Sequence, residues 1–287
     1  MLHHKLVCLK TDDVIDDEYT LHHTDGALLR TQYSRKLNPR DLLGVWKYAD
    51  WLPTSTISEN VAGTITYKAE KLAEALGMSD LWVTFHGYWP EKGGLCPTGT
   101  FKDMEAVPTL VRIADHGCKG IICASAGNTA RSFSYYCGLS DTPLIVIVGA
   151  LHGERLWLPK NHPRESVKIV VIKDGDYWSA TKVSKKLAQK LEGWQLEGGA
   201  HNIARRDGIG TLMLDAAFTI GALPTHYFQG IGGGPGPIGV NEMASRLIDF
   251  GIFEGPLPRQ HVSQNTQHCP IHNAWQDGRP ILQDSDF

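Results

Sequence analysis

The chain lacks the long apolar runs and the excess of one charge that mark several classes of protein. No apolar run approaches the length of a membrane span, and the opening stretch MLHHKLVCLK lacks the hydrophobic region of a signal peptide. The net charge of −3 gives no reason to expect nucleic acid or an anionic membrane surface as a partner. We therefore expect a cytoplasmic protein that acts on small molecules.

Paired cysteines and metal-ligand spacings are also missing. The six cysteines are scattered singly, without a CxxC pair, which favours free thiols over a disulfide framework. Histidine pairs occur at His3-His4 and His22-His23, and His268 precedes Cys269, but none of these has a zinc-type spacing. The sequence therefore predicts no metal site.

What the chain does contain is ordinary globular composition with an α/β rhythm. Its 287 residues are 42% hydrophobic and 21% charged, enough for one large or two modest domains. The first 60 residues look polar and irregular, with a short helical patch around residues 40–48. Beyond them we expect helices at residues 67–76, 104–117, 128–138, 177–191 and 210–221, and strands at residues 81–85, 120–124, 144–148, 168–172 and 225–229. This alternation predicts parallel sheets with helices on both faces.

A single lysine stands in the loop Pro97–Asp103 (PTGTFKD), just before a predicted helix. Lysine forms an imine with an aldehyde, and an apolar neighbour such as Phe101 lowers the pKa of its amine. Thr98 and Thr100 add hydroxyl groups. The alternative is an ordinary helix N-terminus, capped by Thr100, with Lys102 on the surface.

A second loop, Ser125–Thr129 (SAGNT), follows an apolar strand and opens another helix. Its unpaired backbone N–H groups lie at the positive end of a helix dipole, where a carboxylate binds well. Asn128 could reach a phenolic oxygen of a cofactor. Together with Lys102, the loop suggests pyridoxal phosphate rather than a nucleotide; the alternative is a plain N-cap with a turn glycine.

The glycine run Gly230–Gly239 follows a short apolar strand, and its bare amides could cradle a phosphate. Gly234, Gly236 and Gly239 satisfy the GxGxxG spacing of dinucleotide-binding folds. That match is weak, because Pro235 and Pro237 remove two of the N–H groups such a loop would use. A structural turn is the alternative.

These three loops occur in the order found in the fold-type-II pyridoxal phosphate enzymes. The chain most resembles the threonine synthase branch of that family, and within it the cysteate synthases, through most of its length. The stretches that carry the resemblance are VWK at 45–47, WLP at 51–53, GYWPEK at 87–92, ASAGNT at 124–129, LWLP at 156–159, EGGAHNIARR at 197–206 and NAWQ at 273–276. Cys8 alone remains of the paired cysteines often seen near the N-terminus of these relatives.

The resemblance implies a tryptophan synthase β-subunit-like fold, with two parallel-sheet α/β domains and the cofactor between them. Residues 1–105 with 196–287 would form the larger, cofactor-binding domain, and residues 106–195 the smaller one. Relatives continue beyond position 287 by roughly half a domain, so the larger domain is expected to be incomplete. The enzyme is accordingly expected either as a homo-oligomer, such as a dimer, or with a second polypeptide that completes the fold.

The resemblance also implies roles for the residues of the three loops. Lys102 would carry the cofactor, Asn128 would contact the pyridine O3′, and other members of the second loop would hold the substrate carboxylate. These substrate-binding residues are Ser125, Ala126, Gly127 and Thr129. The cofactor phosphate would be bound by Gly232, Gly233, Gly234 and Gly236. Arg131, and either Arg205 or Arg206, are cations available for phosphate or sulfite; alternatively they are solvated surface charges.

The activity implied is replacement of the β-substituent of O-phosphoserine, through an aminoacrylate intermediate, by a small anion such as sulfite, giving cysteate. A threonine synthase-like γ-replacement and an amino-acid deaminating lyase would use the same lysine. A shortened relative without catalysis, acting as a binding subunit, would keep only the scaffold. These alternatives remain open at this point.

Overall fold

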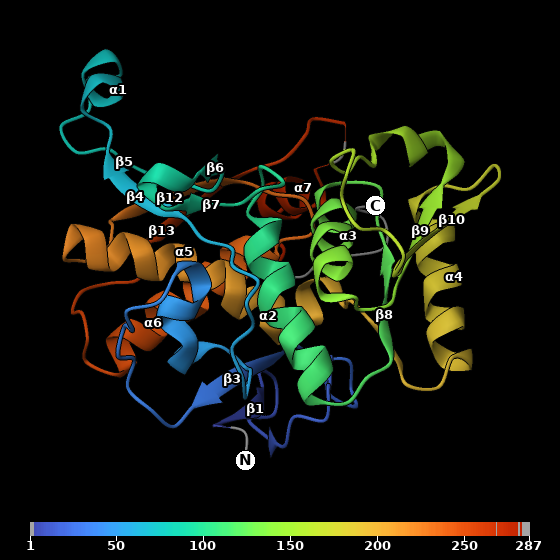
Figure 1. Ribbon diagram of the computed structural model, residues 1–287. Helices are drawn as coiled ribbons and strands as arrows, with labels where there is room; N and C mark the ends of the chain where they lie inside the picture. The colour runs from blue at the N-terminus through green and yellow to red at the C-terminus, as the bar shows by residue number, and fades with distance from the viewer. Residues whose placement is uncertain (1–2, 268, 281, 283–287) are drawn as a thin grey trace.

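The computed structural model describes residues 3–267, 269–280 and 282 (Figure 1). Its helices are α1 (Glu70–Ala75), α2 (Lys102–Asp115), α3 (Asn128–Ser140), α4 (Tyr177–Lys190), α5 (Ile203–Ile220), α6 (Pro235–Asp249) and α7 (Pro270–Gln276), with 3-10 turns η1 (Gly44–Trp51), η2 (Pro90–Lys92), η3 (Ala150–Arg155) and η4 (Gly199–His201). Its strands are β1 (His4–Cys8), β2 (Val14–Ile15), β3 (Leu29–Tyr33), β4 (Ile65–Lys68), β5 (Trp82–Phe85), β6 (Tyr88–Trp89), β7 (Gly94–Leu95), β8 (Gly120–Ala124), β9 (Leu144–Gly149), β10 (Val167–Ile172), β11 (Trp194–Leu196), β12 (His226–Gly230) and β13 (Arg259–Ser263).

A four-stranded parallel sheet, ordered β10-β9-β8-β11, carries a helix on each face. Successive side chains of a strand point to opposite faces. In β8, Ile121 belongs to the same buried cluster as Phe133 of α3, whereas Ile122 packs in a cluster with Ala180 of α4. Figure 1 shows α3 and α4 on opposite sides of this sheet. The predicted α/β class with parallel sheets is confirmed.

The remaining strands form smaller sheets. β12 and β13 pair in parallel, while β2-β1-β3, β4-β5 and β6-β7 are antiparallel. The four-stranded sheet spans residues 120–196 and so lies almost wholly inside the predicted smaller domain. The division of the chain into two domains itself stays a prediction.

Several element predictions were wrong in ways that have physical reasons. The first 60 residues are not irregular: Leu6 and Leu29 of the β1-β3 pair are buried against Ile203 of α5. The helix expected at 67–76 is confirmed over Glu70–Ala75, whereas residues 67–68 belong to the end of β4. The helix expected from residue 210 begins at Ile203, because the Asn202 side chain accepts a hydrogen bond from the Ala204 N–H at 3.0 Å and caps it.

Glycines allow α5 to pack closely against α2 and α6. These contacts position the N-terminal ends of α2 and α6, which carry parts of the predicted site. A Cβ added to Gly208 of α5 would lie 2.1 Å from the Met104 carbonyl oxygen of α2. A Cβ on Gly239 of α6 would lie 2.1 Å from the Arg206 carbonyl oxygen of α5. Only glycine permits so close an approach of two backbones. The N-terminal ends of α2 and α6 are therefore held in a set position around α5.

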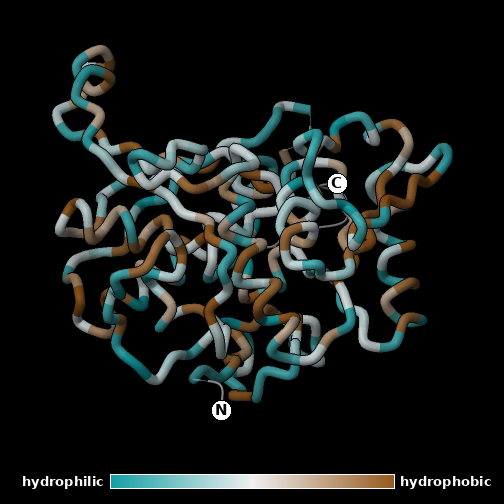
Figure 2. The backbone as a smooth tube through the Cα atoms, in the orientation of Figure 1, coloured by the Kyte–Doolittle hydropathy of each residue, from teal (hydrophilic) through white to brown (hydrophobic). Residues whose placement is uncertain are grey.

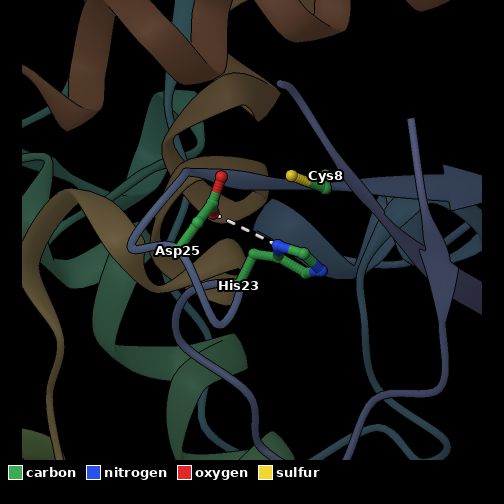
Figure 3. A group of neighbouring side chains, drawn as sticks. All are labelled: Cys8, His23 and Asp25. Atoms are coloured by element: carbon green, nitrogen blue, oxygen red, sulfur yellow. Dashed lines mark hydrogen bonds and ion pairs between the residues drawn. The ribbon is translucent and has the colours of Figure 1, made fainter. Parts of the chain in front are cut away.

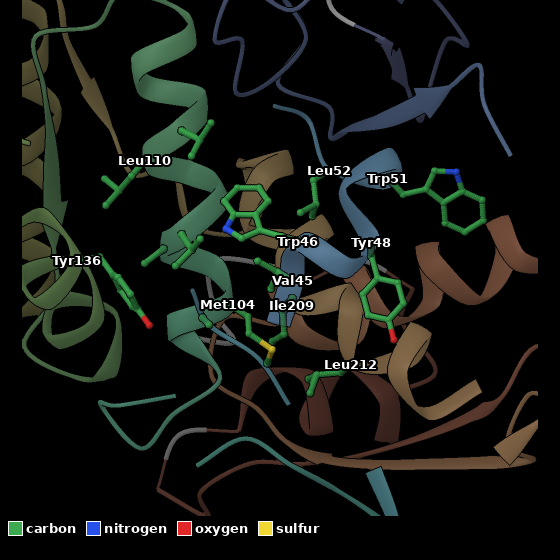
Figure 4. Close-up of a cluster of buried hydrophobic side chains, with 14 of the residues drawn as sticks. Val45, Trp46, Tyr48, Trp51, Leu52, Met104, Leu110, Tyr136, Ile209 and Leu212 are labelled. Carbon is green, nitrogen blue, oxygen red and sulfur yellow. The ribbon is translucent and has the colours of Figure 1, made fainter. Parts of the chain in front are cut away.

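The main core lies where η1 packs against these helices. Figure 4 shows Trp46 of η1 with Met104 of α2 and Ile209 of α5, and all three side chains are almost fully buried. In Figure 2, α4 alternates between hydrophobic and hydrophilic residues along its length, as expected of a helix with one face on a sheet. Within the described ranges, no helix is long and apolar enough to cross a bilayer.

Candidate active site

One cavity, with a volume of about 560 Å³, lies where the N-terminal ends of α2, α3 and α6 converge. It gathers segments that are far apart in the chain. The predicted site residues that line it are Lys102, Ser125, Asn128, Thr129, Arg205, Gly232, Gly233, Gly234 and Gly236. Ala126, Gly127, Arg131 and Arg206 are not among the described residues that line it.

Lys102 is the first residue of α2, and its side chain is 15% exposed. Its Nζ donates a hydrogen bond to Glu105 Oε1 at 2.7 Å and lies 4.7 Å from the centre of the Phe101 ring. Burial lowers the pKa of the Lys102 amine; the Glu105 carboxylate opposes this shift and the Arg205 guanidinium adds to it. A lysine with a lowered pKa is a better nucleophile near neutral pH.

The loop before Lys102 is tied to α3 by a buried carboxylate that the sequence did not single out. Asp103 accepts hydrogen bonds from the Thr98 N–H at 2.9 Å and from the Thr98 and Ser132 hydroxyls. Burial raises the pKa of the Asp103 carboxyl, although these hydrogen bonds oppose the shift. The network joins the ends of α2 and α3, so that Lys102 and Asn128 face one cavity.

The second predicted loop leads directly into α3, whose first residue is Asn128. Ser125, Asn128 and Thr129 line the cavity, whereas Ala126 and Gly127 are outside its lining. The Asn128 Oδ1 accepts a hydrogen bond from Arg131 Nη2 at 2.6 Å, and the Thr129 hydroxyl lies 3.4 Å from Arg205 Nη2. The start of α3 thus faces the same space as Lys102.

The glycine run forms the loop that enters α6. Gly234, with φ of +81°, precedes the helix, and Pro235 is its first residue, a position that proline favours because no N–H is lost there. Pro237 also lacks an N–H, and that of Ile238 bonds to the Gly234 carbonyl at 3.4 Å. Gly236 therefore supplies the free N–H of the first turn, beside the amides of the loop.

The three candidate arginines have different surroundings. Arg205 is 4% exposed, lines the cavity and pairs with Glu105 and Glu197. Arg206 is buried and bonds to the Ala200 and Leu29 carbonyls and to Glu242. Arg131 lines a separate cavity of about 100 Å³, where its guanidinium carbon lies 4.5 Å from the centre of the Trp157 ring.

Some residues in or next to the cavity carried no prediction from the sequence. Glu105 is buried behind the cavity lining and contacts Lys102, one helical turn earlier, a spacing that brings side chains together. Glu197 was noted only as part of the EGG stretch, without a role. The others that line the cavity are Tyr177, Gln229, Ser263, Gln264 and Asn265. Ser263 ends β13, and its carbonyl accepts the Ile231 N–H at 2.8 Å, which links this strand to the glycine loop.

A possible metal-ligand group lies elsewhere, at the N-terminal sheet. Figure 3 shows Cys8, His23 and Asp25 facing one another, with ligand atoms within 4.8 Å. Their polar atoms already have partners: His23 Nδ1 lies 3.1 Å from Asp25 and Nε2 3.4 Å from Asp13, while Lys10 lies 3.2 Å from Asp25. Protein groups alone account for this cluster. Of the histidine pairs considered above, His268 lies outside the described residues.

The chain is similar to several known proteins. A cysteate synthase of Methanocella arvoryzae is 47% identical over 285 residues, which cover 98% of this chain and 68% of the relative. A cysteate synthase of Methanosarcina acetivorans is 43% identical over 277 residues, covering 96% of this chain and 66% of the relative. This chain therefore spans about two thirds of the length of these relatives.

Solved structures show the fold. Serine racemase from maize superposes with a TM-score of 0.57 at 17% identity, covering 77% of this chain and 61% of that one. The enzyme of Dictyostelium discoideum gives a TM-score of 0.55 at 17% identity, covering 77% and 66%. The family described as pyridoxal-phosphate dependent enzyme matches residues 57–286. The chain belongs to this family, and its cofactor is pyridoxal phosphate.

The cavity fits this cofactor. An amine stands at one side, on Lys102, and a helix N-terminus with a glycine loop stands at another, where a phosphate binds well. A Cβ added to Gly232, Gly233 or Gly234 would meet nothing within 4 Å, so open space lies beside the loop amides. A Cβ on Gly236 would lie 2.5 Å from the amide end of the Gln229 side chain, so this side chain packs directly against the first turn of α6.

Proposed function

We propose that this pyridoxal-phosphate dependent enzyme replaces the phosphate of O-phosphoserine with a small anionic nucleophile such as sulfite, giving cysteate. The observation that carries the proposal is the single cavity that unites Lys102, the start of α3 and the glycine loop before α6. Identities of 47% and 43% to proteins named cysteate synthase support the choice of reaction.

The glycine loop and the start of α3 supply the sites for the fixed anions. We propose that Gly232, Gly233, Gly234 and Gly236 hold the cofactor phosphate and that Asn128 contacts the ring oxygen O3′. Ser125 to Thr129 would hold the substrate carboxylate through the N–H groups at the mouth of α3. When bound, the cofactor supplies the electron sink that allows the Cα proton of an amino acid to leave.

Lys102 performs the proton transfers of the proposed reaction. Its Nζ takes the proton from Cα of O-phosphoserine and returns it to Cα at the end. Between these transfers the Cβ–O bond breaks, with its electron pair remaining on phosphate, and the sulfite lone pair forms the C–S bond. The exchange consumes one sulfite and releases one phosphate, without an oxidant or a reductant. The lowered pKa of the amine suits a base that works near neutral pH.

The incoming and leaving anions need positive groups near Cβ. Of the described cavity-lining residues, Lys102 and Arg205 are the cationic ones, and Arg205 is already paired with Glu105 and Glu197. We therefore propose that backbone N–H groups at the helix N-termini provide much of the anion stabilisation. Arg131 would act at a distance, by orienting Asn128 through their hydrogen bond.

The test is a reaction with the purified, cofactor-loaded chain. Incubation with O-phosphoserine and sulfite should release phosphate and form cysteate, measured by phosphate assay and mass spectrometry, and release should depend on sulfite. Lys102→Ala protein is the control. Turnover of homoserine phosphate in place of O-phosphoserine would establish γ-replacement instead. Release of ammonium with a keto acid would establish a deaminating lyase, and binding without turnover of any of these would indicate a non-catalytic subunit.

We further propose that the enzyme works as a homo-oligomer, such as a dimer, or with a second polypeptide that completes the fold. Large apolar side chains on the surface support this: Leu151 is 80%, Trp275 72% and Phe228 66% exposed. Aromatic side chains such as those of Trp275 and Phe228 are enriched in the cores of protein interfaces. In the first version, light scattering of the purified chain should give a mass above that of one chain; in the second, the purified chain should be inactive until its partner polypeptide is added. A monomer that turns over by itself would contradict both versions.

We also propose a cytoplasmic location, supported by the state of the cysteines. All six are free, and four of them (Cys8, Cys96, Cys123 and Cys137) are buried. Unpaired thiols are typical of proteins kept in a reducing compartment. Thiol titration of freshly isolated, denatured protein should find no disulfide, and a paired cysteine would contradict this location.

A further inference from the structure

Glu105 is a fully buried carboxylate beside the proposed lysine, and the reaction described above gives it no role. Its side chain is 0% exposed. One oxygen, Oε1, accepts the hydrogen bond from Lys102 Nζ at 2.7 Å, and the other, Oε2, accepts one from Arg205 Nε at 2.7 Å and a second from Nη2. One buried carboxylate thus bridges two cations, Lys102 and Arg205, which both line the cavity.

A carboxylate buried this deeply has to be paired to be tolerated, and Arg205 alone would serve that need. The pair Arg206–Glu242, on α5 and α6, is the comparison within the same molecule. Its side chains are 0% and 10% exposed, with Nε and Oε2 3.2 Å apart, but Arg206 does not line the cavity as Arg205 does, and among the described residues no lysine pairs with Glu242. The additional contact to Lys102 is what sets Glu105 apart.

We propose that Glu105 is a positioning residue for Lys102, which holds Nζ at the cavity and stabilises a proton on that atom. This inference rests on the proposed function: as the family resemblance implies, Lys102 would carry the cofactor at rest, and its Nζ would accept the Cα proton during the reaction. A negative charge in direct contact favours the protonated form of the nitrogen in both states. Because the carboxylate is shared with Arg205, it keeps its place when Lys102 moves toward the substrate.

The charged groups that act on Nζ come from three elements. Glu105 lies on α2 itself, Arg205 is on α5, and Glu197 follows β11; the Phe101 ring completes the surroundings. Removing the charge of Glu105 leaves Arg205 to repel the protonated nitrogen, with Glu197 as the remaining opposing charge. The loss of the Glu105 charge and the repulsion by Arg205 both disfavour the protonated nitrogen, so it should lose its proton at a lower pH.

The experiment is a pH titration of the visible absorption band of the cofactor-loaded protein, which reports protonation at Nζ. Glu105→Gln should lower the midpoint by about 1 pH unit or more, since an opposite charge in contact shifts a pKa by ~1–3 units. Glu105→Asp keeps the charge and should restore part of the shift. Glu242→Gln, the matched change in the comparison pair, should leave the midpoint where it is in the wild type.

The outcomes separate this inference from the proposed function. If the wild type shows a band whose midpoint is the same in Glu105→Gln, the inference fails while the proposed function stands, even when the variant melts at a lower temperature. If Glu105→Gln does not fold, Glu105→Asp carries the test: its carboxylate is farther from Nζ, so an unchanged midpoint overturns the inference. If the wild type forms no cofactor band, the proposed function fails and the inference fails with it.

Discussion

Two buried arginine–carboxylate pairs in this molecule are alike in chemistry and different in surroundings. Arg112 of α2 donates to Asp17 from Nε at 2.8 Å, and both side chains are 0% exposed. Arg205 of α5 donates to Glu105 from Nε at 2.7 Å, but it also lines the cavity. The first pair lies in the interior, and the second stands at the edge of the site.

The difference is in what else each carboxylate touches. Asp17 is held by framework groups, including His4 at 3.1 Å and the Tyr19 N–H at 3.0 Å, which join the N-terminal segment to α2. Glu105 Oε1 instead accepts a hydrogen bond from Lys102 Nζ. We call the Asp17–Arg112 pair closed, because its carboxylate contacts framework groups, and the Glu105–Arg205 pair open, because its carboxylate also contacts Lys102. The closed pair stabilises the fold, and we propose that the charge of the open pair acts on Lys102. Substitutions in the two pairs should therefore change different observables.

The largest effect should follow from removing the Lys102 amine, which contacts Glu105 of the open pair. Lys102→Ala should abolish the cofactor chromophore that borohydride fixes to the protein, and turnover should fall below detection, since the substitution removes the amine proposed to carry the cofactor and to move the Cα proton. Peptide mass mapping of the reduced protein measures the first result. Lys92→Ala, at an exposed lysine of η2, is the control and should keep the label on Lys102. A label on another lysine would contradict the assignment.

The next effect concerns the closed pair. Asp17→Asn should lower the free energy of unfolding by about 3–5 kcal/mol, because it leaves the Arg112 charge buried without its partner. Chemical denaturation measures the loss. The pH midpoint of the cofactor band should stay at its wild-type value in this variant. A shifted midpoint would mean that the two pairs are coupled, and it would contradict the claim that they affect different observables.

The same pair predicts how stability depends on pH. Burial would raise the pKa of Asp17, but hydrogen bonds from His4 and Arg112 outweigh it and lower the pKa well below the usual 3.8. A depressed pKa contributes stability above the unfolded value and loses it as the pH falls through the folded value. Wild-type stability should thus fall steeply below about pH 4. The fall should be shallower in Asp17→Asn, as measured by denaturation at a series of pH values.

Three strands of the four-stranded parallel sheet, β8, β9 and β10, could be predicted from the sequence because they are short apolar runs between helices. The fourth, β11 (Trp194–Leu196), was missed, because it is only three residues long and contains a glutamine. The sheet β2-β1-β3 could not be predicted, because polar residues interrupt its apolar ones and their partner, Ile203, is distant in the chain. A period of two was nevertheless visible in β3, where Leu29, Thr31 and Tyr33 are buried and the two residues between them are exposed. The early start of α5 depended on recognising Asn202 as a cap.

The candidate site was predictable where one loop carries its own chemistry, as around Lys102 and Gly232–Gly236. It was not predictable where a role depends on tertiary contacts. Arg205 and Arg206 are neighbours with the same side chain, yet one lines the cavity and the other binds carbonyls in the core. Glu105 became notable only when α5 brought Arg205 to it.

A smaller effect is expected at the start of α3, next to the open pair. Thr129→Ala should weaken binding of the amino-acid substrate by ten- to a hundredfold, because a lost charge-assisted hydrogen bond costs about 1.5–3 kcal/mol. Asn128→Ala should instead change the cofactor spectrum. Spectral titration with O-phosphoserine measures both. Thr181→Ala, on α4 and outside the cavity lining, is the control. An unchanged titration of Thr129→Ala would argue against a carboxylate at this helix.

The smallest effect should come from Arg131. It lies beside the main cavity, whereas Arg205 lines it. Arg131 stacks on Trp157 and bonds to Asn128, so Arg131→Lys should cost only about 0.5–1 kcal/mol, or two- to fivefold in affinity for O-phosphoserine. The reason is that its effect reaches the cavity through the orientation of one amide. A loss of tenfold or more in sulfite or O-phosphoserine affinity would show instead that this guanidinium contacts an anion directly, as the sequence alone suggested. Arg131 would then have to be counted, with Lys102 and Arg205, among the cations that act directly on the substrate, and the comparison of the two pairs would no longer describe every arginine that affects the site.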